Sequence, residues 1–183
     1  MKIITDVGKV LTNYDTNVNI ENKLINISNS LETLSKWKSN GFEIYICSFL
    51  CSEKKAYKRI NRLKSDGHNG LFNAQYYVTN KLYKKDIAGY IDGDIMIDDN
   101  EEILNQIKLL YPHIVTILFQ EFNLLKKKSN KKHFVANNWI QVDKLVDQIM
   151  KKFDQKIFLS NCNLLVNKYS VKELDENIYF VDE

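Results

Sequence analysis

The chain has 183 residues, of which 44% are apolar and 27% charged, a balance typical of a globular protein with one compact domain and room for a modest extension. Six glycines and one proline exclude collagen-like and proline-rich sequences, and the net charge of +3 indicates no particular class of partner. No apolar run approaches the ~18 residues that a membrane span requires. We therefore expect a soluble, cytoplasmic protein with no membrane partner.

Strand-like and helix-like patterns alternate along most of the chain. A β-branched run ends at Gly8, and the first helical pattern ends at Gly41, where glycine is a natural C-cap. The second helix places Ala56, Tyr57, Ile60 and Leu63 on one face, and the last carries Ile140, Leu145, Ile149 and Met150. The predicted strands are residues 2–7, 43–48, 75–79, 94–97 and 113–119, and the predicted helices are residues 29–40, 53–66, 83–91, 101–110 and 139–153.

This alternation predicts an α/β fold of three layers, in which a Rossmann-like parallel sheet of five strands has helices on both faces. We expect residues 1–153 to form this domain. Residues 154–183 are then a C-terminal extension, and two apolar runs within it indicate one or two strands or a hairpin. Cys47, Cys51 and Cys162 form no CxxC pair, which favours three reduced thiols over a disulfide framework or a metal site.

Residues that suit chemistry lie at the ends of predicted strands or shortly after them, at the edge where parallel sheets bind ligands. Each has an ordinary structural interpretation when taken alone, as a turn, a helix cap or a solvated charge. In chain order they are Asp6 and Gly8 after the first strand, Ser48 at the end of the second, Lys84 at the start of the helix after the third, and Asp98 and Asp99 at the end of the fourth.

In this order the four elements resemble the motifs of the haloacid dehalogenase (HAD) superfamily, which are an Asp after the first strand, a Ser or Thr, a Lys and an acidic pair. The resemblance covers residues 2–119. Residues 84–99, with residues 117–123 and 138–139, are similar in particular to the small 5′-nucleotidase-like members of that superfamily.

The resemblance implies a phosphatase that depends on Mg²⁺. Asp6 would attack the phosphorus atom and form an aspartyl-phosphate, which divides hydrolysis into two steps. Magnesium would be bound by the Asp6 carboxylate, the Gly8 carbonyl and the carboxylates of Asp98 and Asp99, since this ion prefers oxygen ligands.

The remaining implied roles concern the phosphate. Ser48 would donate a hydrogen bond to it, and Lys84 would supply positive charge to both Asp6 and the phosphate. Lys81 and Lys85 are alternatives to Lys84, because the spacing of the motif lysine varies most. The expected substrate-binding residues are Gly8, Lys9, Ser48, Phe49, which follows a catalytic strand and would stack on a base, Lys81 and Lys85.

One position departs from the common pattern of the superfamily. Most of its phosphatases carry a second Asp two residues after the nucleophile, as general acid and base, whereas this chain has Gly8. Such a residue is typically worth ~10²–10⁴ in rate, so we expect a slow enzyme or one that prefers good leaving groups. Asp15 is the conceivable substitute. A catalytically weakened binding or scaffold protein with this fold is the alternative.

The spacing between motifs leaves no room for a folded cap domain, because residues 13–47 and 49–83 are largely used by a helix and the next strand. An open site favours a large substrate. Two basic clusters, residues 54–64 and 126–132, favour a nucleotide or a phosphorylated nucleic-acid end as the phosphorylated substrate, although a solvated helix face and a loop explain them equally well. A phosphoprotein is the further alternative, and the oligomeric state is left open.

Overall fold

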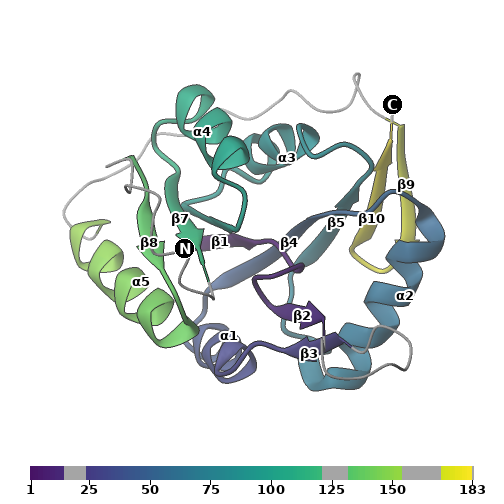
Figure 1. The fold of residues 1–183 in the computed structure, drawn as a ribbon, viewed down its shortest axis with the longest axis horizontal. Coiled ribbons are helices and arrows are strands. Elements are labelled where there is room, and N and C mark those ends of the chain that lie inside the picture. Colours follow the sequence, from purple (N-terminus) through teal and green to yellow (C-terminus); the bar gives the residue numbers. More distant parts are fainter. Residues whose placement is uncertain (15–23, 121–131, 154–169, 183) are drawn as a thin grey trace.

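The computed structural model of the protein describes residues 1–14, 24–120, 132–153 and 170–182, and Figure 1 shows their arrangement. Eight strands form one sheet in the order β8-β7-β6-β1-β4-β5-β10-β9, and β2 pairs with β3 in a separate hairpin. The strands are β1 (Lys2–Thr5), β2 (Thr12–Tyr14), β3 (Leu24–Asn26), β4 (Glu43–Phe49), β5 (Ala74–Val78), β6 (Ile95–Asp98), β7 (Val115–Phe119), β8 (Phe134–Ala136), β9 (Ser170–Asp175) and β10 (Ile178–Asp182).

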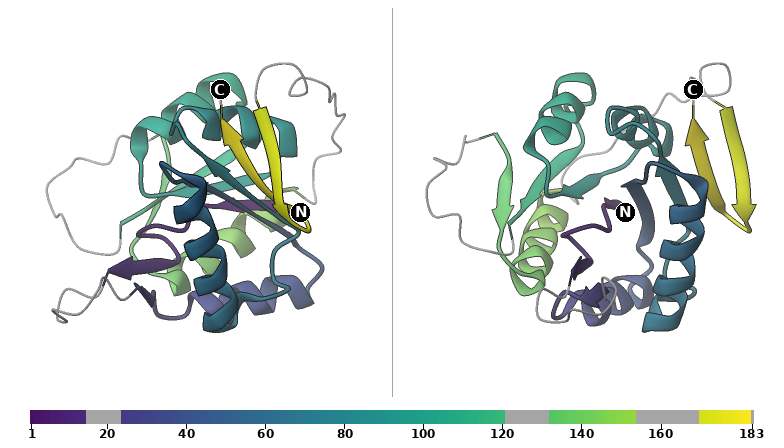
Figure 2. Two further views of the ribbon diagram at one scale, coloured as in Figure 1. Left: turned by 90° about the vertical axis from the view of Figure 1, so that its right-hand side faces the viewer. Right: turned by 45° about the vertical axis from the view of Figure 1, so that its right-hand side comes forward.

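Helices cover both faces of this sheet, as the two side views show (Figure 2). Strand residues alternate between the faces, so that Ile3 packs with α1, α2 and α5 while its neighbour Ile4 packs with α3 and α4. Every strand pair in the large sheet is parallel except β9 with β10. The helices are α1 (Ser30–Ser39), α2 (Glu53–Leu63), α3 (Tyr83–Ile91), α4 (Glu101–Leu110) and α5 (Trp139–Phe153). The predicted three-layer α/β fold is confirmed.

Helix ends follow local sequence signals. Gly41 takes a φ of +79° directly after the C-cap of α1, as the sequence predicts. Gly67, with a φ of +88°, interrupts the helical geometry within the turn Lys64–His68 that continues α2. Asn100 caps α4 through its side chain, which accepts hydrogen bonds from the amides of Glu102 and Ile103. None of the helices in the described ranges combines the length and apolar character needed to cross a membrane.

The predicted count of five strands in the sheet is wrong, because three more strands extend it at its two edges. Strand β8, three residues long, pairs with β7 at one edge. At the other edge β10 pairs with β5, and β9 folds back on β10. A hairpin was expected within residues 157–183, but the sequence gives no sign that it joins the main sheet. Such pairing is a tertiary event between distant segments.

Two predicted helix faces need correction. Tyr57 is 41% exposed, and Arg59 replaces it on the face of α2 that packs against the sheet. In α5, Ile140 is 52% exposed, while Trp139 and Val142 point into the core. The other predicted members of the two faces are buried or partly buried, so one residue in each helix was assigned wrongly. Cys47 and Cys51 are free thiols, as expected, and Cys162 lies outside the described residues.

Candidate active site

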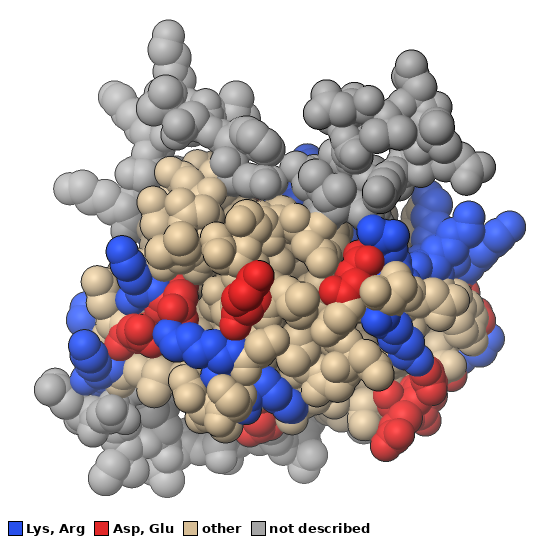
Figure 3. Space-filling model, turned by 90° about the horizontal axis from the view of Figure 1, so that it is seen from below, with Lys and Arg blue, Asp and Glu red and all other residues tan. Residues whose placement is uncertain are grey.

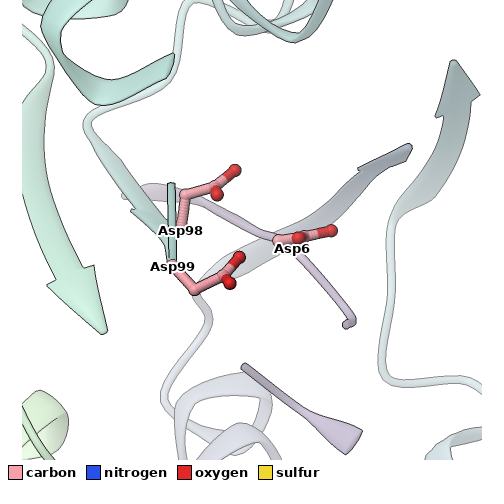
Figure 4. Close-up of side chains that lie close together, drawn as sticks. All are labelled: Asp6, Asp98 and Asp99. Atoms are coloured by element: carbon pink, nitrogen blue, oxygen red, sulfur yellow. The ribbon is translucent and has the colours of Figure 1, made fainter. Parts of the chain in front are cut away.

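Three carboxylates converge where β1 and β6 end side by side (Figure 4). Thr5 of β1 is in register with Ile97 of β6, so Asp6 and Asp98 follow at the same level of neighbouring strands, and Asp99 comes next. One oxygen from each of the three carboxylates lies within 4.8 Å of the others. The parallel sheet thus brings together acidic residues that are more than ninety positions apart in the chain.

Lys84 neutralises part of this negative charge from the buried side of the cluster. Its side chain is 3% exposed, and its ammonium lies 2.8 Å from Asp98 Oδ2 and 3.0 Å from Asp6 Oδ2. The residue lies in the first turn of α3, which begins shortly after β5 ends, on the helix face that is buried against the sheet. Lys81 is exposed and Lys85 is half-buried. Of these three lysines, Lys84 is therefore the one that contacts the carboxylates.

The electrostatics of the cluster are unbalanced. Burial acts to lower the pKa of Lys84, but the charges of Asp6 and Asp98 outweigh it and raise that pKa above its ordinary value. Burial raises the pKa of Asp98 well above its usual range, with Lys84 opposing and Asp6 adding to the shift. Burial and the charge of Asp6 also raise the pKa of Asp99. One ammonium therefore does not compensate three neighbouring carboxylates.

Residues 7–12 form a tight turn directly after the candidate nucleophile. The Val7 carbonyl accepts hydrogen bonds from the amides of Leu11 and Thr12, each at 3.0 Å. The Val7 amide donates to Asp6 Oδ1 at 2.7 Å, which orients that carboxylate. A Cβ atom at Gly8 would meet no atom within 4 Å, and the φ of Gly8 lies outside the left-handed region. The turn therefore has room for a side chain at the position where the general acid is missing.

The other predicted site residues lie around this edge. Ser48 is buried near the end of β4, one position beyond the level of Asp6. The exposed Lys9, with a φ of 59°, places its ammonium 3.9 Å from Asp99 Oδ2. Lys81 Nζ lies 5.5 Å from the centre of the Phe49 ring, a cation–π distance. The contacts of these residues with a substrate stay predictions.

Some predictions fall outside the described residues. They are the substitute acid Asp15, most of the basic cluster 126–132 and residues 122–123 of the nucleotidase-like pattern.

Sequence reasoning missed Arg59, a buried cation on the opposite side of the turn from Lys84. Arg59 is 8% exposed, and its Nη1 donates to Thr12 Oγ1 at 3.0 Å. From the sequence, we treated it only as one member of the basic run 54–64, without a role of its own. The available signal was spacing, because residue 59 lies three positions after Ala56 and four before Leu63, on the apolar stripe of α2.

The residues present fit a magnesium ion. The cluster offers carboxylate oxygens, which are the ligands that Mg²⁺ prefers, from three side chains close enough to share one ion. Burial first, and then the charge of Asp6, raises the pKa of both Asp98 and Asp99, and a divalent cation would offset this cost.

Comparisons with known proteins give a likeness of fold. No protein-family model matches the chain, and no curated protein matches its sequence. Among solved structures, an uncharacterized protein from Listeria monocytogenes serotype 4b shares 17% identity over 82% of this chain and 99% of that one, with a TM-score of 0.59. The D,D-heptose 1,7-bisphosphate phosphatase from B. bronchiseptica, crystallised with magnesium and phosphate, shares 16% over 81% and 99%, also with a TM-score of 0.59.

A HAD-superfamily hydrolase from Ehrlichia chaffeensis is similar to the same extent, with 10% identity over 81% of this chain and 97% of that chain and a TM-score of 0.58. These structures match nearly their whole length, so the likeness extends well beyond the sheet. The chain therefore has the haloacid dehalogenase-like fold that its four motifs predicted.

Proposed function

We propose that the protein is a magnesium-dependent phosphatase that hydrolyses phosphate monoesters through Asp6. The observation that carries the proposal is the convergence of Asp6, Asp98 and Asp99 within 4.8 Å of one another beside the buried ammonium of Lys84. A cluster of carboxylates around a buried lysine at the carboxyl edge of a parallel sheet suits the binding of a metal ion and a phosphate together. The HAD-like fold supports the same conclusion.

In the first chemical step, an oxygen of the Asp6 carboxylate attacks the phosphorus atom. The bond from phosphorus to the ester oxygen breaks, and the alcohol leaves with a proton taken from solvent. Water then cleaves the aspartyl-phosphate, which releases inorganic phosphate and restores the Asp6 carboxylate. Lys84 and the Val7 amide each contact one oxygen of Asp6, so they fix the direction of this carboxylate.

The phosphate needs positive charge and hydrogen-bond donors around it. The Ser48 hydroxyl would donate to one phosphate oxygen, and Lys84 would lower the charge repulsion between Asp6 and the phosphate. When bound by Asp6, Asp98, Asp99 and the Gly8 carbonyl, Mg²⁺ would supply the charge neutralisation that one lysine cannot.

The absence of an acid at residue 8 favours substrates whose leaving group departs without a proton donor. We infer that aryl phosphates and acyl phosphates react faster than alkyl phosphates. The same feature supports the second candidate function, a binding or scaffold protein that keeps the fold and turns over poorly.

For the substrate, we infer a nucleotide or a phosphorylated nucleic-acid end. Lys54 and Lys58 are exposed on α2, the helix that leaves the Ser48 strand. Seen from the side of α1, positive side chains lie on both sides of the molecule among negative ones, and one group is on the side of α2 (Figure 3). The exposed lysines of α2 favour anionic substrates.

The test is the release of phosphate from p-nitrophenyl phosphate with and without Mg²⁺, in the wild-type protein and in Asp6→Asn. The enzyme proposal expects magnesium-dependent turnover that the variant loses by at least ~10³-fold, because an amide is not a nucleophile. Equal rates in both proteins would contradict the enzyme proposal and favour the binding or scaffold function. Parallel assays of nucleotides and phosphopeptides separate the nucleotide substrate from a phosphoprotein.

A further inference from the structure

Arg59 is a buried cation that the proposed chemistry does not use. It is one of two arginines in the chain, and the other, Arg62, lies three residues later on the same helix. Arg62 Nε pairs with Asp66 Oδ2 at 2.7 Å. In contrast, no carboxylate within residues 1–14, 24–120, 132–153 or 170–182 makes an ion pair with Arg59. A guanidinium that is 8% exposed is costly to keep without a counter-charge.

Hydrogen bonds link Arg59 through Thr12 to the turn that follows the candidate nucleophile. Its Nη1 donates to Thr12 Oγ1 at 3.0 Å, and Thr12 Oγ1 in turn lies 3.4 Å from the Val7 carbonyl, at the turn that carries Asp6. Helical side chains lean toward the N-terminus of their helix, and α2 begins where β4 ends. The Arg59 side chain is therefore directed toward the carboxyl edge of the sheet.

The electrostatics of Tyr77 agree with this position. Tyr77 is the β5 residue in register with Ser48. Burial is the first cause that raises its pKa, while the charge of Arg59 lowers that pKa and the charge of Asp6 raises it. One hydroxyl therefore senses both the guanidinium and the nucleophile.

Among the residues that the structure describes, Thr12 Oγ1 is the acceptor that the Arg59 guanidinium contacts. A guanidinium carries five N–H donors in a rigid fork suited to phosphate, so it can bind an anion as well as a hydroxyl. Arg59 is thus a largely buried charge whose geometry suits an anionic group.

We propose that Arg59 binds a second anionic group of the substrate, separated by a few atoms from the phosphate that Asp6 attacks. The substrate class is then a phosphate monoester that carries another phosphate or a neighbouring phosphodiester. Lys84 serves the transferred phosphate on one side of the Asp6 turn, and Arg59 selects the rest of the substrate on the other. The inference rests on the proposed phosphatase function and narrows its substrates.

The experiment compares kcat/KM for four substrates in the presence of Mg²⁺. They are a nucleoside 5′-monophosphate, the corresponding nucleoside 3′,5′-bisphosphate, a 5′-phosphorylated dinucleotide and p-nitrophenyl phosphate. Each is assayed with wild-type protein, Arg59→Gln, Arg59→Lys and the matched control Arg62→Gln. The ratio between two substrates in one preparation is independent of the fraction of protein that is folded, so it remains meaningful if a variant is destabilised.

We expect the wild-type protein to prefer a substrate with a second anion over the monophosphate by about 10- to 100-fold, the value of a hydrogen-bonded charge pair. Arg59→Gln should abolish this preference, Arg59→Lys should keep part of it, and Arg62→Gln should leave the ratio unchanged. The bisphosphate and the dinucleotide identify the source of the second anion.

Two results would overturn the inference while the phosphatase stands. The first is that the wild-type protein shows no preference for substrates with a second anion. The second is that Arg59→Gln lowers kcat/KM by the same factor for all four substrates, which would mean that Arg59 only stabilises the turn after Asp6. If the wild-type protein hydrolyses none of the four, the proposed function itself fails.

Discussion

Lys84 and Lys9 approach the same carboxylate cluster from opposite environments. Lys84 lies on the buried side, with a side chain 3% exposed and two carboxylates at 2.8 and 3.0 Å. Lys9 lies on the solvent side, with a side chain 70% exposed and Asp99 at 3.9 Å. Water screens the second pair but not the first, because the effective dielectric constant falls with burial. Of these two cations, the buried Lys84 therefore contributes more to the stability of the cluster than the exposed Lys9.

The largest expected effect is that of Lys84→Met. Removing one partner of a buried ion pair costs about 3–5 kcal/mol, since the remaining carboxylates keep the penalty of burial. We expect this loss in the free energy of unfolding measured with urea, together with the loss of phosphatase activity. An unfolding free energy within about 1 kcal/mol of the wild-type value would show that Lys84 and Lys9 are equivalent after all.

Gly8→Asp tests whether an acidic side chain on the solvent side of the cluster assists catalysis. The structure leaves space for a side chain at this position. An acid at this position should raise kcat for an alkyl phosphate by ~10²-fold, the lower end of what general acid–base catalysis supplies. Gly8→Asn is the control, because it has nearly the same shape and cannot donate or accept the proton. Equal rates for the two variants would contradict the assignment of the missing acid.

Magnesium should stabilise the protein, since the ion binds the folded cluster and not the unfolded chain. At a hundred times its Kd the gain is about 2.7 kcal/mol, visible as a higher Tm that EDTA reverses. Asp98→Asn should reduce the shift, and sodium chloride at equal ionic strength is the control. A Tm that responds to both salts alike would argue against a metal site.

The smallest expected effect is that of Lys9→Met. An exposed pair at 3.9 Å contributes at most about 1 kcal/mol, and raising the salt concentration should remove even this. Urea unfolding of Lys9→Met in low and high salt checks the point. A cost as large as that of Lys84→Met would require Lys9 to lie in a much drier environment than its exposure indicates.

The sequence predicted the centre of the fold and the acidic cluster for the same reason. Short, mostly apolar runs such as 43–48 indicate buried strands, and parallel strands end at a common edge. Asp6 and Asp98 therefore meet once β1 and β6 are neighbours. The catalytic roles of these residues remain predictions.

Two kinds of feature escaped prediction. Strands β2, β3 and β8 have three residues each, too few to show alternation. Arg59 is of a residue type usually found at the surface, and its place on the apolar stripe of α2 is the local signal that it is buried. Residue type alone does not carry that information.

The pairing of β10 with β5 bears on the order in which the protein folds. Gln75 and Ile178 are register partners about a hundred residues apart, so closing this pair is entropically demanding. During synthesis, the outer edge of β5 stays without its neighbour until residues 178–182 emerge from the ribosome. A nascent chain at that stage has a strand edge with unpaired backbone groups, which can pair with strands of other molecules. We therefore expect the β9–β10 hairpin to reduce aggregation once it has paired with β5.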